Sequence, residues 1–195
     1  MDSWPSIGAS PNLHAVIVVE GISDRVALEA VAARQGRVLA DEGVAVVPIG
    51  GAHALRSFLV GLGSRRNQLQ LAGLCDAGEE LVFRTALERA GFGADLTRLD
   101  MERLGFYVCE VDLEDELIRA LGPAAVETIL AAHDDLGAFR TFQKEPAWRG
   151  QRIEAQLRRF MGSADRRKIR YARLLSEALD PQQVPRPLSG VLASV

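Results

Sequence analysis

Three acidic residues in this sequence directly follow apolar segments that are typical of β-strands. They are Glu20 after residues 14–19, Asp76 after residues 69–75, and Asp112 after residues 105–111. Ligands of an open α/β sheet bind at the carboxyl ends of its strands, so we expect these side chains to converge although they are far apart in the sequence. Asp24 lies one helical turn beyond the first of them, and Glu114 lies two residues beyond the last. The sequence therefore predicts a crevice that contains five carboxylates.

Such a crevice needs positive charge, because carboxylates that share a site raise one another's pKa values. Hard oxygen ligands favour Mg²⁺ or Mn²⁺ over Zn²⁺. Two such ions, about 3.5–4 Å apart, can stabilise both the attacking and the leaving oxygen of a phosphodiester displacement. The five acids therefore predict a two-metal site suited to cutting nucleic acid.

Each acid also has a simpler explanation that stays open at this point. Asp24 can complement the dipole of a helix whose first turn it occupies. Asp112 can be a helix N-cap, with Glu114 in the acidic first turn of a solvated helix. An aspartate after a buried strand, here Asp76, can also accept a phosphoryl group in a phosphatase or a receiver-like domain. The occurrence of acids at three strand ends together favours the metal site.

The elements that position these acids are predicted by the apolar patterning of residues 1–122. We expect strands at residues 14–19, 44–47, 69–75 and 105–111, and helices from a cap at Ser23 to about residue 35, at residues 53–62 and through residues 81–90. Short, β-branched runs of this kind are typical of strands covered on both faces. The alternation of strands and helices predicts an α/β fold, with a four-stranded, mainly parallel sheet flanked by helices.

The remainder of the chain, residues 123–195, is predicted to be a helical extension. Apolar stripes at helical spacing predict helices near residues 113–121, 126–130, 153–160 and 164–178. We expect Pro181, Pro185 and Pro187 to break any further helix. The tail should then pack through its apolar side chains, which are Leu188, Val191 and Leu192.

Basic residues are concentrated in this extension. Nine basic and two acidic residues give residues 149–173 a charge of +7, whereas the whole chain carries −3. Such a stretch predicts a sequence-independent grip on phosphates, through Arg158, Arg159, Arg166, Arg167 and Arg170. No series of aromatic residues is interleaved for base stacking, so we expect a duplex backbone as the partner.

The cysteines and the hydropathy of the sequence indicate in which cellular compartment the protein works. Cys75 and Cys109 lie in apolar segments without partners at metal-ligand spacing, which fits the reduced cytoplasm. No segment approaches the roughly 20 apolar residues that span a bilayer, so we expect a soluble protein with no membrane partner. The phosphate loop G-x-x-x-x-G-K-S/T does not occur in the sequence, so we expect no ATP site in this chain.

Three motifs that contain the acids resemble the topoisomerase-primase (Toprim) domain of the overcoming-lysogenization-defect (OLD) family of nucleases. They are VIVVEGISD at residues 16–24, LAGLCDAGEE at residues 71–80 and EVDLEDELIRALG at residues 110–122. The likeness continues in residues 142–150 and 166–175, so it covers most of the chain. The usual Toprim Asp-x-Asp motif has Gly78 at its second acidic position here, which argues against a topoisomerase or a primase.

The resemblance implies a Toprim-like fold and a Mg²⁺- or Mn²⁺-dependent DNA endonuclease that works with two ions. Its principal ligands would be Glu20, Asp76, Asp112 and Glu114, with Asp24 holding the second ion. Lys168, similar to a late lysine of the family, would stabilise the charge that develops on the phosphate. Its simpler explanation is a solvated basic helix face. Glu20, Asp76 and Lys168 are thus the predicted catalytic residues.

The resemblance also bears on partners. OLD nucleases usually join the Toprim domain to an ATPase, so we expect either a separate ATPase subunit or a stand-alone nuclease, and a homodimer is compatible with both. The alternative function is a non-catalytic, DNA-binding or regulatory subunit of an ATPase partner, in which Gly78 has weakened the metal site.

Overall fold

The structure, a computed structural model, describes residues 12–195 and is built on a four-stranded sheet with the order β2-β1-β3-β4. All neighbouring strands pair in parallel. The strands are β1 (Ala15–Val19), β2 (Val44–Pro48), β3 (Gln70–Cys75) and β4 (Phe106–Val108). The predicted α/β fold with a four-stranded parallel sheet is confirmed.

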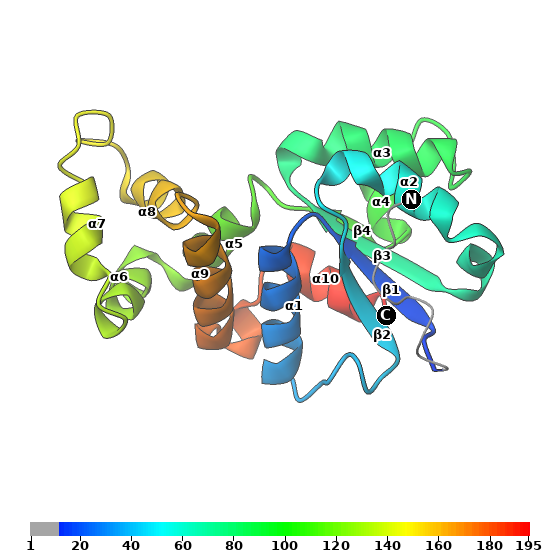
Figure 1. The fold of residues 1–195 in the computed structure, drawn as a ribbon, viewed down its shortest axis with the longest axis horizontal. Helices are drawn as coiled ribbons and strands as arrows, with labels where there is room; N and C mark the ends of the chain where they lie inside the picture. Colours follow the sequence, from blue (N-terminus) through cyan, green and yellow to red (C-terminus); the bar gives the residue numbers. More distant parts are fainter. Residues whose placement is uncertain (1–11) are drawn as a thin grey trace.

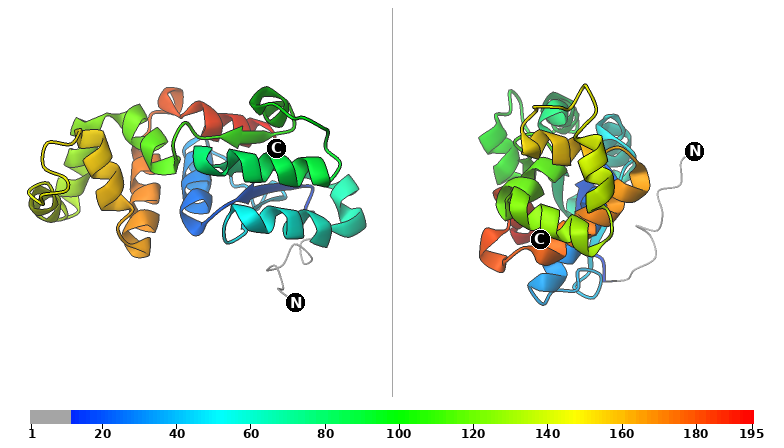
Figure 2. Two further views of the ribbon diagram at one scale, coloured as in Figure 1. Left: turned by 90° about the horizontal axis from the view of Figure 1, so that it is seen from above. Right: turned by 90° about the vertical axis from the view of Figure 1, so that its left-hand side faces the viewer.

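The sheet is covered on both faces, as its apolar strands require. Alternate residues of β1 enter two separate cores, with Ile17 and Val19 in one and Val16 and Val18 in the other. The second core is closed by α2 (Leu55–Gly61), α3 (Glu80–Arg89) and α4 (Arg98–Arg103). The first is closed by α1 (Ile22–Arg34) and α10 (Arg186–Ala193). Figure 2 shows the resulting layers.

The remaining helices form an arm beside the sheet (Figure 1). They are α5 (Leu113–Leu121), α6 (Pro123–Ala132), α7 (Leu136–Phe142), α8 (Ile153–Met161) and α9 (Asp165–Ala178). The last of these returns to pack along α1. Short 3₁₀ turns occupy Ala52–Ala54, Gly63–Gln68, Ala77–Glu79 and Pro181–Gln183.

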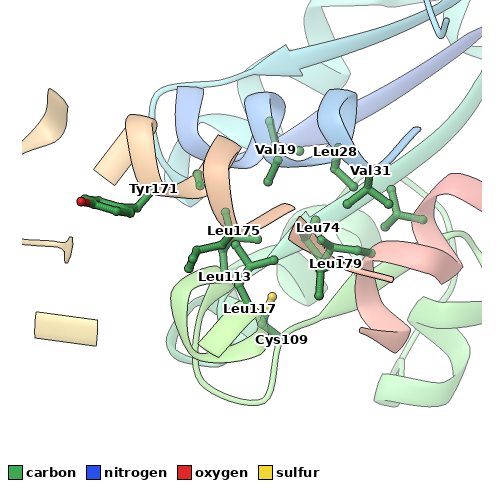
Figure 3. Close-up of a cluster of buried hydrophobic side chains, with 14 of the residues drawn as sticks. Val19, Leu28, Val31, Leu74, Cys109, Leu113, Leu117, Tyr171, Leu175 and Leu179 are labelled. Carbon is green, nitrogen blue, oxygen red and sulfur yellow. The ribbon is translucent and has the colours of Figure 1, made fainter. Parts of the chain in front are cut away.

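The arm is anchored to the sheet by a buried apolar cluster (Figure 3). Leu113 of α5 and Leu175 of α9 meet Leu28 of α1 there, next to Val19 and Leu74 at the ends of β1 and β3. This packing brings α5 and α9 to the carboxyl ends of the strands, where the acidic residues were predicted to gather.

Two details of the sequence prediction are wrong. Ser23 does not cap α1, because the helix begins at Ile22 after Gly21, whose N–H donates to Asp24. The prolines do not prevent a last helix, since α10 forms with Pro187 in its first turn, where a missing N–H costs nothing. The predicted packing of Leu188, Val191 and Leu192 is confirmed, because all three are buried.

The boundaries of the other elements agree with the patterns within a few residues, except that β4 is shorter than predicted. The helices α4 and α7 had no counterpart in the prediction. The division of the chain after residue 122 stays a prediction, and residues 1–11 of the proposed core lie outside the described residues. None of the helices between residues 12 and 195 has the length and apolar character that crossing a bilayer requires.

Candidate metal centre

Glu20 and Asp76 meet at the ends of neighbouring strands. Each follows its strand directly, β1 for Glu20 and β3 for Asp76. The backbone N–H of Asp76 donates to Glu20 Oε1 over 3.0 Å. The predicted convergence of these two strand ends is therefore present, and the Glu20 side chain is held by the backbone of the adjacent strand.

Asp24 lies in the first turn of α1, immediately beside this pair. Its Oδ2 accepts the N–H of Gly21 over 2.7 Å, and the residue is only 8% exposed. Burial raises the pKa of Asp24, although the hydrogen bond from Gly21 and the charge of Lys168 oppose that shift. Asp24 thus both completes the start of the helix and lies in the electrostatic field of the site, so its two explanations are compatible.

Asp112 and Glu114 approach from α5. Asp112 caps the helix, with Oδ1 accepting the N–H of Asp115 over 2.9 Å, while Oδ2 accepts Nε–H of Arg158 over 2.6 Å. Glu114 is only 5% exposed, so its interpretation as part of a solvated first turn is wrong. The Lys168 ammonium of α9 lies 3.6 Å from Glu114 Oε1, which is an ion-pair distance. The same oxygen is buried without a hydrogen-bond partner among the described residues.

Several of these acids have pKa values above the ordinary range of a carboxyl group. Burial, followed by the charges of Glu20, Asp24 and Asp112, raises the pKa of Asp76 to about 8. Burial also raises the pKa of Glu20 and of Glu114. At Asp76, burial and the neighbouring acids together therefore outweigh the opposing charge of Lys168.

Lys168 is a cation that interacts electrostatically with several of these acids. Burial alone would lower the pKa of Lys168, but the carboxylates of Glu114, Asp24 and Asp76 outweigh burial and raise it. Its side chain is 36% exposed. Lys168 is therefore a charged, half-buried neighbour of the acids, and its interpretation as part of a fully solvated face is wrong.

The chemistry of the acids suits a hard divalent cation. All five donors are carboxylates, one buried oxygen of Glu114 lacks a hydrogen bond among residues 12–195, and Asp76 favours its neutral form without added positive charge. Within the same residues, no group of three or more His, Cys, Asp and Glu side chains is arranged so that it could hold an ion as it stands. An ion would therefore require rotation of some of these side chains.

The five arginines predicted to bind phosphates differ in their partners. Arg158 binds Asp112, and Arg170 donates to Asp135 Oδ2 over 3.2 Å. Arg167 donates to Ser163 Oγ and lies 4.2 Å above the ring of Phe160. The other two, Arg159 and Arg166, are exposed and have no hydrogen-bond or ion-pair partner within the described part of the chain.

Two features of the site were missed in the sequence. The first is the contact of Arg158 with Asp112, because no local pattern pairs a residue of α8 with the cap of α5. The second is Glu116, which is buried, accepts the N–H of Glu110 over 2.7 Å and pairs with Arg119 over 2.8 Å. Its spacing of three residues from buried Leu113 could have placed it on the inward face of the helix.

The two cysteines take no part in this chemistry. Cys75 and Cys109 are buried free thiols, and burial raises the pKa of each. A thiol with a raised pKa is a poor nucleophile and a poor metal ligand at neutral pH.

Comparison with known proteins gives a family-level match for the first third of the fold. The model of the "Overcoming lysogenization defect protein-like, TOPRIM domain" family matches residues 14–66. These residues hold β1, α1, β2 and α2, and they include Glu20 and Asp24. No curated protein matches the chain.

Solved structures extend the likeness over nearly the whole chain. The C-terminal region of the Xanthomonas campestris pv. campestris OLD protein, phased with platinum, is 23% identical with a TM-score of 0.70 and covers 94% of this chain and 92% of its own. The same region phased with iodine is 22% identical, with a TM-score of 0.68 and 93% of each chain covered. The C-terminal region of the Burkholderia pseudomallei OLD protein is 19% identical, with a TM-score of 0.66 and coverages of 92% and 95%.

This chain has the OLD-type Toprim fold. The resemblance found in the sequence motifs is thereby confirmed, and for this OLD-type Toprim domain it includes the helical arm as well as the sheet.

Proposed function

We propose that this OLD-type Toprim domain is a DNA endonuclease that depends on a divalent metal, Mg²⁺ or Mn²⁺. One observation carries the proposal: Asp76 lies among Glu20, Asp24 and Asp112 with its pKa raised to about 8. A folded protein that concentrates carboxylates in this way gains most from cations bound between them. Phosphodiester cleavage is the reaction that such a site at strand ends serves, in agreement with the nuclease family whose domain model matches residues 14–66.

The residues proposed to hold two ions are Glu20, Asp76, Asp112 and Glu114, with Asp24 at the second ion. When bound, the ions would supply the positive charge that activates a water molecule and neutralises the leaving oxygen. The protein contributes the fixed positions: the backbone of Asp76 orients Glu20, and the backbone of Gly21 orients Asp24.

Lys168 is the proposed catalytic cation on the protein side. Its ammonium group lies beside the acids, and the charges of Glu114, Asp24 and Asp76 keep it protonated. A protonated amine in this position can neutralise negative charge that develops on a phosphate during cleavage.

The proposed partner is DNA, bound through the phosphates by Arg159 and Arg166, which are exposed and have no internal ion pair within the described residues. Arg158, Arg167 and Arg170 would join them if they leave their internal partners. We further propose that the protein works in the cytoplasm. We propose that residues 1–122 form the catalytic core and residues 123–195 an extension of it. If the function needs ATP hydrolysis, we propose that an ATPase outside these residues carries it out. A homodimer is compatible with this arrangement.

A second function is favoured by two specific observations. Gly78 replaces an acid of the usual Toprim motif, and Asp112 and Glu114 already face basic side chains. These features also suit a non-catalytic, DNA-binding or regulatory subunit of an ATPase partner. That protein would bind DNA without needing a metal.

The two functions are separated by incubating supercoiled plasmid with the purified protein in Mg²⁺, in Mn²⁺ and in EDTA. The endonuclease proposal expects nicked or linear plasmid with a metal only, and a loss of at least about 100-fold in Glu20→Gln and Asp76→Asn. Asp41→Asn is the matched control, because Asp41 is exposed in the loop between α1 and β2. Intact plasmid in both metals, with DNA retained in a binding assay, would favour the regulatory subunit.

A further inference from the structure

The contact between Arg158 and Asp112 joins a side chain of the arm to one of the proposed metal ligands. The guanidinium Nε–H donates to Asp112 Oδ2 over 2.6 Å. Asp112 is 14% exposed, whereas Arg158 is 44% exposed. The acid is thus held in the site, while the base reaches it from the solvent side.

Both oxygens of Asp112 are occupied. Oδ1 accepts the N–H of Asp115 and thereby caps α5, while Oδ2 accepts from Arg158. A divalent cation that binds Asp112 Oδ2 comes close to the positively charged guanidinium of Arg158 and is repelled by it, whereas the neutral N–H of Asp115 exerts no such repulsion. The N–H of Asp115 is fixed by the helix, but the guanidinium of Arg158 ends a flexible side chain that is already 44% exposed, so it can turn into water more easily.

The helix that carries Arg158 can stay in place during such an exchange. Leu157, Phe160 and Met161 of α8 are buried in the core of the arm. Arg158 and Arg159 form the exposed part of the same helix. Within α8, only the side chain of Arg158 has to rotate.

We propose that Arg158 substitutes for the metal at Asp112: it neutralises this carboxylate in the metal-free domain, and a divalent cation displaces it. This inference rests on the proposed function and adds a regulatory role for one residue of the arm. The displaced guanidinium is freed beside Arg159 and becomes available to a DNA phosphate. Arg158 therefore pairs with Asp112 in the metal-free domain and with a DNA phosphate when a metal is bound.

The exchange links the two ligands of the domain. A metal ion that releases Arg158 adds one cation to the DNA-binding face, so it should strengthen DNA binding. By reciprocity, DNA that captures Arg158 should strengthen metal binding by the same factor.

The test is a titration of the full chain with Mn²⁺, without DNA, in which electron paramagnetic resonance measures free Mn²⁺. Arg158→Gln is compared with the unchanged protein and with Arg159→Gln. The control variant removes the same charge from the next residue of the same helix, but Arg159 has no ion-pair partner within residues 12–195. We expect Arg158→Gln to bind Mn²⁺ about two- to five-fold more tightly, which is the range for losing one partly exposed ion pair, and Arg159→Gln to bind as the unchanged protein does.

A second pair of variants distinguishes the loss of the Arg158–Asp112 pair from a general effect of changed charge or of a changed fold. In Asp112→Asn the competing pair is already absent, so adding Arg158→Gln should leave the Mn²⁺ affinity of that variant unchanged. Equal affinities of the unchanged protein and Arg158→Gln, or equal shifts in Arg158→Gln and Arg159→Gln, would overturn the role of Arg158 alone. Absence of Mn²⁺ binding in every folded variant would instead overturn the metal-dependent function, and the exchange with it.

Discussion

The acids of the candidate site fall into two groups that are held in different ways. Glu20 and Asp24, at the sheet side, accept backbone N–H groups of Asp76 and Gly21. Asp112 and Glu114, at the arm side, face the basic side chains of Arg158 and Lys168. The fold therefore holds the first group by backbone hydrogen bonds alone, whereas the second group, in which Asp112 also accepts the N–H of Asp115, is in addition neutralised by basic side chains.

This difference suggests how one domain can be stable without metal and still bind it. The sheet side keeps its geometry, but Lys168 compensates its charge only in part, because burial and the neighbouring acids still raise the pKa of Asp76. The arm side compensates charge with Lys168 and Arg158, of which Arg158 is the one that we propose a metal replaces. Removing the Asp76 carboxylate from the sheet side should therefore change the pH dependence of stability, whereas removing Arg158 from the arm side should change the affinity for metal.

Among the variants of basic side chains, the largest effect should come from Lys168→Ala. We expect cleavage to fall on the order of 100-fold, because a charged donor next to the reacting phosphate is lost, while DNA affinity changes little. The matched control is Arg173→Ala on the same helix, since Arg173 pairs with exposed Glu177. Single-turnover cleavage and a filter-binding assay measure the two quantities. Equal losses in both would assign Lys168 to DNA binding only.

The next effect should be on the pH dependence of stability. The pKa of Asp76 rises from 3.8 to about 8 on folding, so the folded metal-free protein holds this proton more tightly than the unfolded chain does. Its stability should therefore fall as the pH rises from about 4 to 8. Asp76→Asn should remove that fall and gain on the order of 1–3 kcal/mol at pH 8, allowing for partial solvent screening.

Urea unfolding in EDTA at several pH values measures this difference. Asp41→Asn, at an exposed position of a loop, should keep the pH dependence of the unchanged protein. Identical profiles for Asp76→Asn and the unchanged protein would contradict the crowding of charge on the sheet side.

Variants of the arginines should differ according to whether the side chain is free to bind DNA or already has a partner within the protein. Arg159→Gln and Arg166→Gln should each lower the salt dependence of DNA binding by roughly one unit of slope, because each is expected to contact one phosphate. Arg170→Gln should instead lower the thermal stability, since Arg170 pairs with Asp135, which also accepts from Tyr171. Fluorescence anisotropy at several salt concentrations and thermal melting give the two quantities. The reverse pattern would contradict our assignment of the exposed pair to DNA.

The smallest effect should come from restoring an acid to the sheet side. A Cβ added at Gly78 would meet no neighbouring heavy atom within 4 Å, so the backbone position has room for Gly78→Asp. We expect Mn²⁺ affinity to rise about two- to five-fold, comparable to one added partly exposed charge pair. Gly78→Asn, of nearly the same shape, should leave the affinity unchanged. Equal changes in both variants would show that charge at this position does not reach the ions.

The sheet and its acids could be predicted because their signals are local. Each strand is a short apolar run, and Glu20 and Asp76 end two of them. The rule that strand ends share one edge then brings distant residues together without knowledge of the packing. The helical arm followed equally from the spacing of apolar residues in α5, α8 and α9.

The contacts that balance the acids could not be predicted, because they depend on how helices far apart in sequence pack. Nothing in the neighbourhood of Arg158 distinguishes it from Arg159, yet one binds Asp112 and the other faces solvent. The last helix was missed for a different reason. Prolines that end a helix in its interior are tolerated in its first turn, where Pro187 lies.

We expect acidic side chains from the sheet side and from the arm side to bind the same divalent ions. A crystal soaked with Mn²⁺ and measured at an anomalous wavelength tests it directly. We expect a peak within about 2–2.5 Å of carboxylate oxygens of Glu20 and Asp76, with Asp112 or Glu114 turned toward it and Arg158 displaced. A well-occupied Mn²⁺ that binds elsewhere, with Arg158 still on Asp112 and Glu20 still on the backbone of Asp76, would contradict the account.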